Sequence, residues 1–361
     1  MNKQVWIIGA GPVGLLLAHL LHQQQITVEI FEKRSHLPNQ SMAIGITPPS
    51  LAILQQLGLR EQFETQGIHI RQANVYENQS LVGTLGFDQA GDHILSLPQT
   101  QTLEILRNSL RHLPNVTLHE NAPFTLNTPL PSDTLVIGCD GSRSTVRERA
   151  GISTQTKSYR AQFVMADFED IEQAGPNARL FFSHQGSVES FPLPSGCRRW
   201  VCQVLPGETP DIPHIIHRVN EASGVDLSGV AHGLHSHFIP TRSLANRFHK
   251  GPFILCGDAA HQLSPIGGQG MNTGFADAYQ LSAALMSPSP TAINRWARHR
   301  KQAFNAAATR AALGMHLGTL TGERSSRMRA MIIRTLLHHS FTSKQLARSY
   351  AMLNLPHPIA I

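Results

Sequence analysis

The sequence predicts an α/β fold in which a Rossmann-like nucleotide-binding domain is interleaved with a mostly antiparallel β domain and followed by C-terminal helices. Three observations predict it. Apolar runs of strand length at 5–8, 134–138 and 253–256 each lead into a glycine-containing turn. Residues 159–240 contain short apolar runs bounded by Gly, Pro or Ser, which is typical of an antiparallel sheet. Beyond residue 300, apolar positions recur at helical spacing.

The composition is that of a globular chain long enough for two interdigitated domains. Its 361 residues are 41% hydrophobic and carry a formal net charge of +6. The four cysteines form neither a CxxC pair nor the spacing of a zinc site; they are Cys139, Cys197, Cys202 and Cys256. Reduced thiols of this kind favour a cytoplasmic location.

The first glycine turn is a dinucleotide-binding pattern in its proper setting. The strand at 5–8 is followed by GAGPVG at 9–14 and then by a helical stretch, and a second strand at 27–31 ends in Glu32. Strand, glycines, helix and acidic residue together are far more specific than the glycines alone. A membrane or secretory segment is the alternative, because 4–21 carries no charge, but the glycine spacing favours a βα turn.

Each position of this pattern has a physical role. Gly9 makes the tight turn, and Gly11 lets a pyrophosphate approach the backbone. Gly14 allows the helix to pack closely on the strand. The carboxylate of Glu32 can hold ribose hydroxyls.

Two further strand ends carry an acidic residue beside a glycine. The strand at 134–138 leads into CDGSRSTVR, with Asp140 followed by hydroxyls and arginines. The strand at 253–256 leads into Gly257 and Asp258, whose carboxylate can accept hydrogen bonds from a polyol. In one parallel sheet, all these ends would meet around a single extended ligand.

A Pro/Gly-rich loop at 264–270 separates Asp258 from the next helix. Its glycines leave backbone N–H groups uncovered beside a helix N-terminus, which suits a phosphate or an electron-rich carbonyl. Taken alone, the stretch has an ordinary βα turn with a glycine loop as its less favoured alternative.

In these three motifs the chain resembles class A flavin-dependent monooxygenases of the para-hydroxybenzoate hydroxylase type. GAGPVG with Glu32, CDGSRSTVR and GDAAHQLSPIGGQGMNTG occur in the family's order, and the likeness extends to about Arg300. The resemblance implies bound FAD, reduction by NADH or NADPH, and transfer of one oxygen atom of O2 through a C4a-hydroperoxyflavin. The substrate it implies is an aromatic or polyketide-like small molecule.

The resemblance also assigns residues. It places the flavin's reactive edge beside Pro265, Gly267 and Gly268. It assigns cofactor binding to Gly9, Gly11, Pro12, Val13, Gly14, Glu32, Lys33, Arg34, Gln99, Asp140, Gly141, Arg147, Gly257, Asp258, Gly268, Gly270, Met271 and Asn272. Gln99 would lie beside the ribityl chain, with Gln101 as the second choice. Where many relatives have a cofactor-contacting arginine this chain has Met42, and Arg34 is the expected substitute.

The expected domains are discontinuous in sequence. The FAD-binding domain takes 1–70, 99–155 and 252–300, the substrate-binding β domain 71–98 and 156–251, and the C-terminal helical region 301–361.

The last part of the chain is basic. Residues 295–361 contain eleven Lys or Arg and one acidic residue, Glu323. The apolar pairs at 332–333 and 336–337 predict an amphipathic helix, which we expect to pack on the flavin-binding domain. An anionic membrane surface and a partner chain are the alternatives. We expect no nucleic-acid partner and a monomer or homodimer.

Histidines can serve as metal ligands or as catalytic bases. His232, His235 and His237 have the spacing of an alternating strand and no acidic or cysteine companion, so we expect no metal there. His261 is expected to pack and hydrogen-bond. The functional alternative to an oxygenase is a flavin-binding protein of the same fold that acts as a non-oxygenase reductase or pathway partner.

Overall fold

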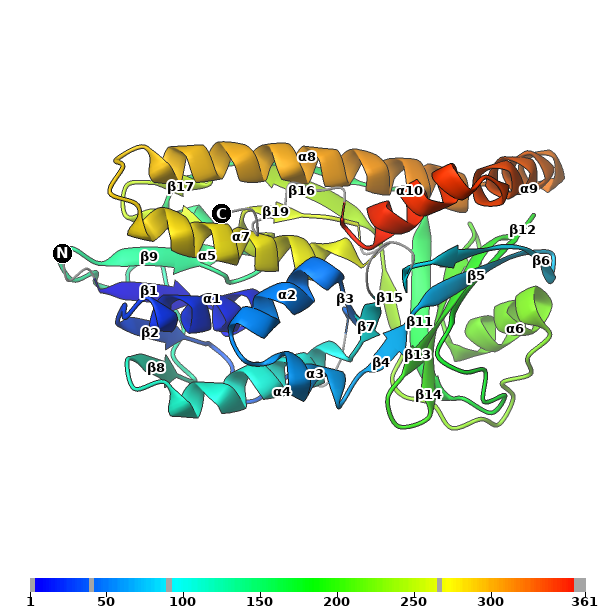
Figure 1. The fold of residues 1–361 in the computed structure, drawn as a ribbon, viewed down its shortest axis with the longest axis horizontal. Coiled ribbons are helices and arrows are strands. Elements are labelled where there is room, and N and C mark those ends of the chain that lie inside the picture. The colour runs from blue at the N-terminus through cyan, green and yellow to red at the C-terminus, as the bar shows by residue number, and fades with distance from the viewer. Residues whose placement is uncertain (1–3, 39–41, 89–92, 265–267, 354–361) are drawn as a thin grey trace.

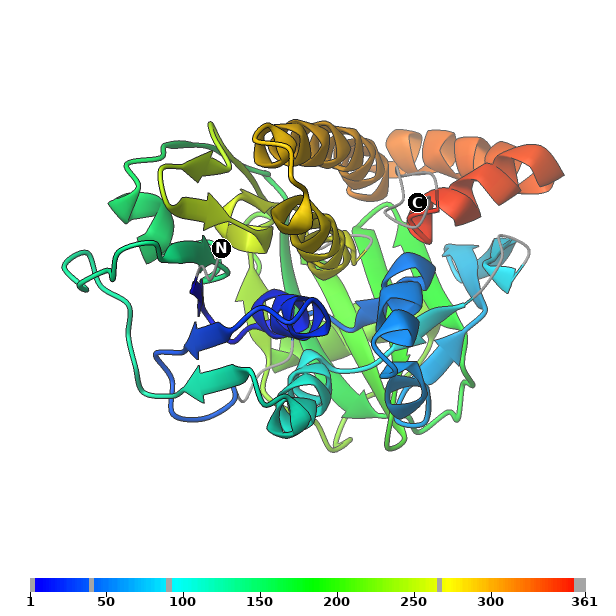
Figure 2. The same cartoon turned by 60° about the vertical axis from the view of Figure 1, so that its left-hand side comes forward.

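The computed structural model describes residues 4–38, 42–88, 93–264 and 268–353. Two layers stand side by side: a parallel sheet with its helices, and a large antiparallel sheet (Figures 1 and 2). Among the helices of the described residues, none is long and apolar enough to cross a membrane.

The first layer is built on a six-stranded sheet with the order β17-β18-β9-β1-β2-β8. Its strands are β1 (Val5–Ile8), β2 (Val28–Phe31), β8 (Val116–His119), β9 (Leu135–Gly138), β17 (His249–Lys250) and β18 (Phe253–Leu255). All neighbours pair in parallel except β17, which runs antiparallel at the edge. The central strand β1 is buried throughout, as expected of a strand covered on both faces.

Helices cover this sheet. They are α1 (Pro12–Gln23), α2 (Pro48–Gln56), α3 (Arg60–Glu64), α4 (Gln99–Ser109), α5 (Thr145–Arg149), α7 (Gln269–Met286) and α8 (Ala292–Gly318). Helix α1 lies between α4 and α7, and α8 runs along α7 (Figure 2). Residues 14–21 of α1 are all buried, so this helix forms the centre of the main core.

The second layer is a seven-stranded sheet with the order β15-β11-β14-β13-β12-β5-β6. Its strands are β5 (Gln72–Glu77), β6 (Ser80–Gly86), β11 (Gln162–Glu169), β12 (Ala178–Ser183), β13 (Gly186–Leu193), β14 (Cys197–Val204) and β15 (Ser236–Phe238). The pairing is antiparallel except between β12 and β5. Helix α6 (Ile212–Ser223) packs its apolar stripe on the face turned away from the first layer (Figure 1).

Two small sheets join the layers. One contains β3 (Gly45–Ile46), β7 (Ile94–Ser96) and β4 (Ile68–Ile70), and the other β10 (Thr154–Ser158), β16 (Thr241–Ala245) and β19 (His261–Gln262). Strand β7 was expected in the substrate layer with the rest of 71–98, but it pairs with β3 and β4. The division of the chain into domains stays a prediction.

The C-terminal helices differ from expectation in where they pack. Helix α9 (Glu323–His338) lies against β6 and β12 of the seven-stranded sheet, whereas we expected it on the first layer. In this position Leu337 of α9 packs in an apolar cluster with Ala73 and Leu85, and Nη2 of Arg329 lies 3.0 Å from Oε1 of Glu77 at the end of β5. Helix α10 (Ser340–Tyr350) then returns to α7, where Nε2 of Gln269 donates to the carbonyl of Ser349 at 3.4 Å.

Candidate functional site

The ends of four parallel strands lie level at one edge of the first sheet. In the ladder, Ile8 is in register with both Phe31 and Gly138, and Gly138 with Leu255. The residues that follow these four positions carry the three sequence motifs. The predicted convergence of the acidic-glycine turns at the carboxyl edge of the sheet is therefore present, and this edge is where open α/β sheets hold their ligands.

The first turn has the tight packing that its glycines predict. Gly9 has φ +102°, and a Cβ built there would lie 2.5 Å from the carbonyl oxygen of Cys139. A Cβ at Gly14 would overlap the carbonyl oxygen of Gly9. A Cβ at Gly11 would meet no atom of the described residues within 4 Å. The side of the turn at Gly11 is thus open to a ligand, and α1 begins there with Pro12.

Val13 has a packing role in addition to its place in the motif. Its side chain lies where Cβ atoms at Gly257 and Gly274 would stand. The start of α1 therefore packs on the Gly257 turn and on α7 through the Val13 side chain, at positions where both have glycine.

Glu32 is held in place by the backbone. Its Oε2 accepts from the amide of Ala10 at 2.8 Å, and its Oε1 accepts from the amide of Arg34 at 3.0 Å. Each carboxylate oxygen can accept a second hydrogen bond, so ribose hydroxyls remain compatible with this arrangement. The side chains of Lys33 and Arg34 are exposed beside it.

Asp140 begins the second turn and caps its short helix. Its Oδ2 accepts from the amide of Val146 at 3.1 Å. Burial raises the pKa of its carboxyl, and the hydroxyl of Ser144 and nearby backbone N–H groups oppose that shift. Gly141 follows with φ +79°, a conformation that favours glycine.

Arg147 links the second and third turns. Its Nη1 donates to the carbonyl of Ala259 at 3.0 Å, and its Nη2 donates to the carbonyl of Ser142 at 2.7 Å. These contacts assign it a structural role, and the expected approach to a pyrophosphate stays a prediction.

Asp258 lies on the short 3₁₀ turn η3 (Gly257–Ala259) that follows β18. Its side chain is open to solvent, but the surrounding protein raises the pKa of its carboxyl through desolvation; His261 opposes this shift and Asp277 adds to it. A carboxylate that is accessible to solvent can accept hydrogen bonds from ligand hydroxyls.

The loop after Asp258 is described in part. Pro265 and Gly267 lie outside the described residues. Gly268 has φ +63° and forms the N-cap of α7, where it has no side chain to cover the first N–H groups.

The first turn of α7 is anchored by Asn272. Its Nδ2 donates to the carbonyls of Gly268 and Gly45, both at 2.9 Å, and its Oδ1 accepts from the amide of Thr47 at 3.0 Å. Gly270 is half-buried and Met271 is buried beside it. Asn272 therefore orients the helix N-terminus through the strand β3.

The sequence reasoning missed a buried network behind these turns, centred on Asp277 of α7. Its Oδ2 is 2.6 Å from Nε2 of His261 and accepts from the amide of Gly257 at 3.2 Å; its Oδ1 accepts from Nε of Arg300 at 2.5 Å. Burial opposes ionisation of Asp277 most strongly, but His261 and Arg300 together hold its pKa below the ordinary value. The sequence feature that could have indicated this network is Asp277 itself, a charged residue on the otherwise apolar stripe of α7.

The expected place of Gln99 beside a ribityl chain stays a prediction. Gln99 begins α4, and its amide donates to the carbonyl of Ala43 at 3.0 Å. The side chain of Met42 is 47% exposed, and its carbonyl accepts from Nη1 of Arg199 at 3.0 Å. An arginine thus reaches this segment from β14, although its guanidinium is also paired with Asp167.

These features fit FAD. The open face at Gly11 and the α1 N-terminus suit the pyrophosphate, Glu32 the ribose, and Asp258 the ribityl chain. The α7 N-terminus suits the flavin's electron-rich carbonyls. In contrast, His232, His235 and His237 are exposed around β15, where His237 contacts Oε1 of Gln162.

The comparisons with known proteins agree with this geometry. A family model described as an FAD binding domain matches residues 2–128 and 132–300. The structure of p-nitrophenol 4-monooxygenase from Pseudomonas putida superimposes with a TM-score of 0.87 at 20% identity, covering 98% of this chain and 99% of that one. This likeness shows the fold.

Among curated relatives, 6-methylpretetramide 4-monooxygenase of Streptomyces rimosus is 31% identical over 319 residues, which is 79% of this chain and 56% of the relative. The 3-(3-hydroxy-phenyl)propionate/3-hydroxycinnamic acid hydroxylase of Klebsiella pneumoniae is 29% identical over 313 residues, with the same two shares. The chain thus spans about half the length of these relatives. With its three turns gathered at one sheet edge and the family model matching most of its length, this chain belongs to the FAD binding domain family.

Proposed function

We propose that this protein is a FAD-dependent monooxygenase that consumes NADH or NADPH and hydroxylates an aromatic or polycyclic small molecule. The observation that carries the proposal is the meeting of the three motif turns at one sheet edge in a chain of this family. The names of relatives support the substrate class, since they are hydroxylases or monooxygenases of phenylpropionates and tetracycline-type polyketides.

The chain's own residues would bind and orient the cofactor. FAD supplies the chemistry of reducing O2 and delivering one of its oxygen atoms. Glu32 and Asp258 would fix its two ends by hydrogen bonds, and the α7 N-terminus would stabilise negative charge at the ring. Asn272 holds that N-terminus in position through its contacts to β3.

The substrate would lie on the inner face of the seven-stranded sheet. The opposite face is filled by α6, with Val188, Trp200 and Cys202 in its core. On the inner face the register aligns Leu180, Glu189 and Val201 across three strands. This row presents one carboxyl between apolar side chains, which suits an aromatic ring with a hydroxyl group.

Glu189 has the properties of a ligand-facing carboxyl. It is partly accessible to solvent, yet burial raises its pKa to about 7. Its charge also acts on Tyr350 of α10. Burial raises the pKa of the Tyr350 hydroxyl, and the negative charge of Glu189 raises it further. The neighbouring Ser349 contacts Gln269 at the start of α7, so this region adjoins the proposed flavin edge.

The activity is tested with purified protein and a panel of phenols and polycyclic hydroxyarenes. We expect an oxidised-flavin spectrum, substrate-stimulated oxidation of NADH or NADPH, and a product heavier by one oxygen atom. Tight FAD binding with neither stimulation nor oxygenated product would instead support the non-oxygenase alternative.

The cofactor site is tested by Asp258→Ala. Removing this carboxylate deletes hydrogen bonds to the ribityl hydroxyls, so FAD affinity should fall about 10–100-fold by fluorescence titration. Asp226→Ala is the matched control, because Asp226 is an exposed carboxylate after α6 and should leave FAD affinity unchanged. Equal affinities of the two variants would refute the assignment of Asp258.

A further inference from the structure

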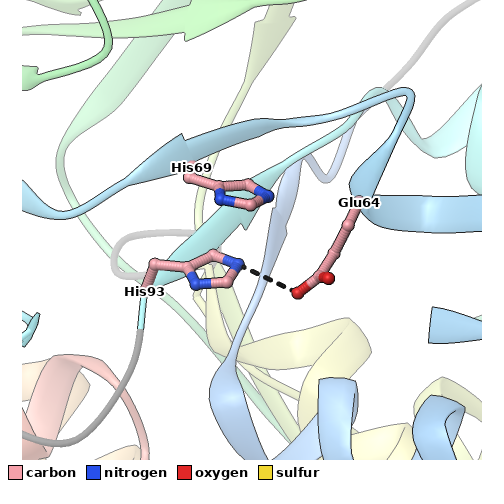
Figure 3. A group of neighbouring side chains, drawn as sticks. All are labelled: Glu64, His69 and His93. Atoms are coloured by element: carbon pink, nitrogen blue, oxygen red, sulfur yellow. Dashed lines mark ion pairs between the residues drawn. The ribbon is translucent and has the colours of Figure 1, made fainter. Parts of the chain in front are cut away.

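Two histidines and a glutamate gather where the flavin-binding layer meets the substrate sheet. Glu64 is the last residue of α3, His69 lies in the middle of β4, and His93 directly precedes β7. Each offers one ligand atom, and these three atoms all lie within 4.8 Å of one another. Figure 3 shows a ring nitrogen of each histidine on the side that faces the Glu64 carboxylate.

The spacing is that of metal ligands. Nε2 of His93 is 3.5 Å from Oε1 of Glu64, which is long for a hydrogen bond. Two ligands at about 2.0–2.1 Å from a tetrahedral zinc ion lie roughly 3.3–3.4 Å apart, so an ion would fit between these atoms. The rings of His69 and His93 stack with centroids 4.0 Å apart and planes 16° apart, so binding one ion requires one ring to turn out of the stack until both nitrogen lone pairs converge.

We propose that Glu64, His69 and His93 form a divalent-cation site, best suited to Zn²⁺, that is independent of the proposed oxygenase activity. Two imidazoles and one carboxylate are a donor set that zinc accepts, with water as the fourth ligand. The side chain of His93 is 5% exposed and that of Glu64 is 27% exposed, so the site is shielded on one side and open to solvent on the other.

An ion here would connect three elements that meet at the layer junction. His69 pairs with Leu95 in the ladder between β4 and β7. The next residue, Ser96, donates from its hydroxyl to the carbonyl of Pro192 on β13, the strand that carries Glu189. The site would therefore stabilise the junction beside the proposed substrate face.

Arg60 competes with the ion. Its Nε lies 2.8 Å from Oε1 of Glu64, in a pair whose side chains are 24% and 27% exposed. Partly exposed pairs four residues apart on a helix are weak, so a metal–carboxylate bond can replace this one. Removing Arg60 should then tighten zinc binding, whereas a purely structural Glu64–Arg60 pair predicts no such gain.

The test is a zinc titration of the full-length, FAD-loaded protein after treatment with a chelator. We expect one Zn²⁺ per chain and a rise in melting temperature of about 2 °C or more at saturation. X-ray absorption at the zinc edge should give nitrogen and oxygen ligands near ~2.0–2.1 Å without the sulfur shell near ~2.3 Å that a cysteine site would show.

Variants locate the site. His69→Ala and Glu64→Gln should each weaken zinc binding at least about tenfold, and Arg60→Gln should strengthen it. Glu61→Gln on the same helix removes an exposed carboxylate and should change nothing, as should His235→Ala in the exposed histidine cluster. Melting curves in chelator establish that each variant is folded.

Two results would overturn the proposal. One is a protein that binds no zinc although it is folded and FAD-loaded. The other is zinc binding that His69→Ala and Glu64→Gln leave unchanged, which would place the ion elsewhere in the chain.

Discussion

Two carboxyl groups, one in each layer, have pKa values that their surroundings shift in opposite directions. In the flavin-binding layer, Asp277 is fully buried and contacts His261, Arg300 and the amide of Gly257, and its pKa is held below the ordinary value. In the seven-stranded sheet, Glu189 is partly accessible, and burial raises its pKa to about 7.

Asp277 therefore has a structural role, whereas the proposed role of Glu189 is to bind a ligand. The protein supplies the hydrogen-bond and charge partners of the Asp277 carboxylate. These contacts fix the geometry around it, including the turn that carries Asp258. A carboxyl whose charged form the protein does not stabilise can instead exchange a proton or a hydrogen bond with a ligand. The comparison predicts that neutralising Asp277 destabilises the fold, whereas neutralising Glu189 stabilises it.

The largest expected effect is that of Asp277→Asn. The substitution keeps the shape but leaves the buried guanidinium of Arg300 without its counter-charge, so stability should fall by about 3–5 kcal/mol in denaturant unfolding at neutral pH. Because the pKa of Asp277 is lowered in the folded state, the stability it contributes is present above the ordinary carboxyl pKa. The gap between wild type and variant should therefore narrow as the pH falls through the lowered pKa.

Glu104→Gln is the control for this prediction. It removes an exposed carboxylate from α4 and should change stability by less than about 0.5 kcal/mol. An Asp277→Asn variant as stable as this control would mean that the network does not support the turn.

The glycine turns could be predicted from sequence because their physics is local. Gly9, Gly14 and Glu32 lie within one βαβ unit, in which Glu32 accepts a hydrogen bond from the amide of Ala10. The level strand ends could be predicted as well, since parallel strands of one sheet place their carboxyl ends at one edge.

Contacts between distant segments could not be predicted in this way. Arg300 reaches Asp277 across 23 positions and Arg329 reaches Glu77 across 252, and no local pattern marks either pair. The second pair and the apolar contacts of Leu337 hold α9 on the seven-stranded sheet, and neither contact can be read from the helix's own sequence. Glu64, His69 and His93 likewise come together through the pairing of β4 with β7.

The smaller effect is that of Glu189→Gln, and its sign is opposite. A carboxyl whose pKa is raised on folding makes the protein less stable as the pH rises from its unfolded pKa to its folded pKa of about 7. Glu189→Gln has no carboxyl to ionise, so above pH ~7 its free energy of unfolding should exceed that of wild type by about 1–2 kcal/mol. This is less than the pKa shift alone would imply, because solvent reaches the carboxyl and screens its charge. Below pH ~4.5 the two proteins should have equal stability.

The same substitution tests the role of Glu189 in recognition. If its carboxylate accepts a hydrogen bond from a substrate hydroxyl, Glu189→Gln should raise KM for hydroxyarenes and remove the pH dependence of KM near neutrality, while FAD affinity stays unchanged. A variant that gains stability but keeps the wild-type KM at every pH would show that Glu189 only destabilises the fold and does not contact substrate. The free energy of unfolding and KM are therefore measured independently. If Glu189 contacts substrate, Glu189→Gln should show both a higher stability and a higher KM.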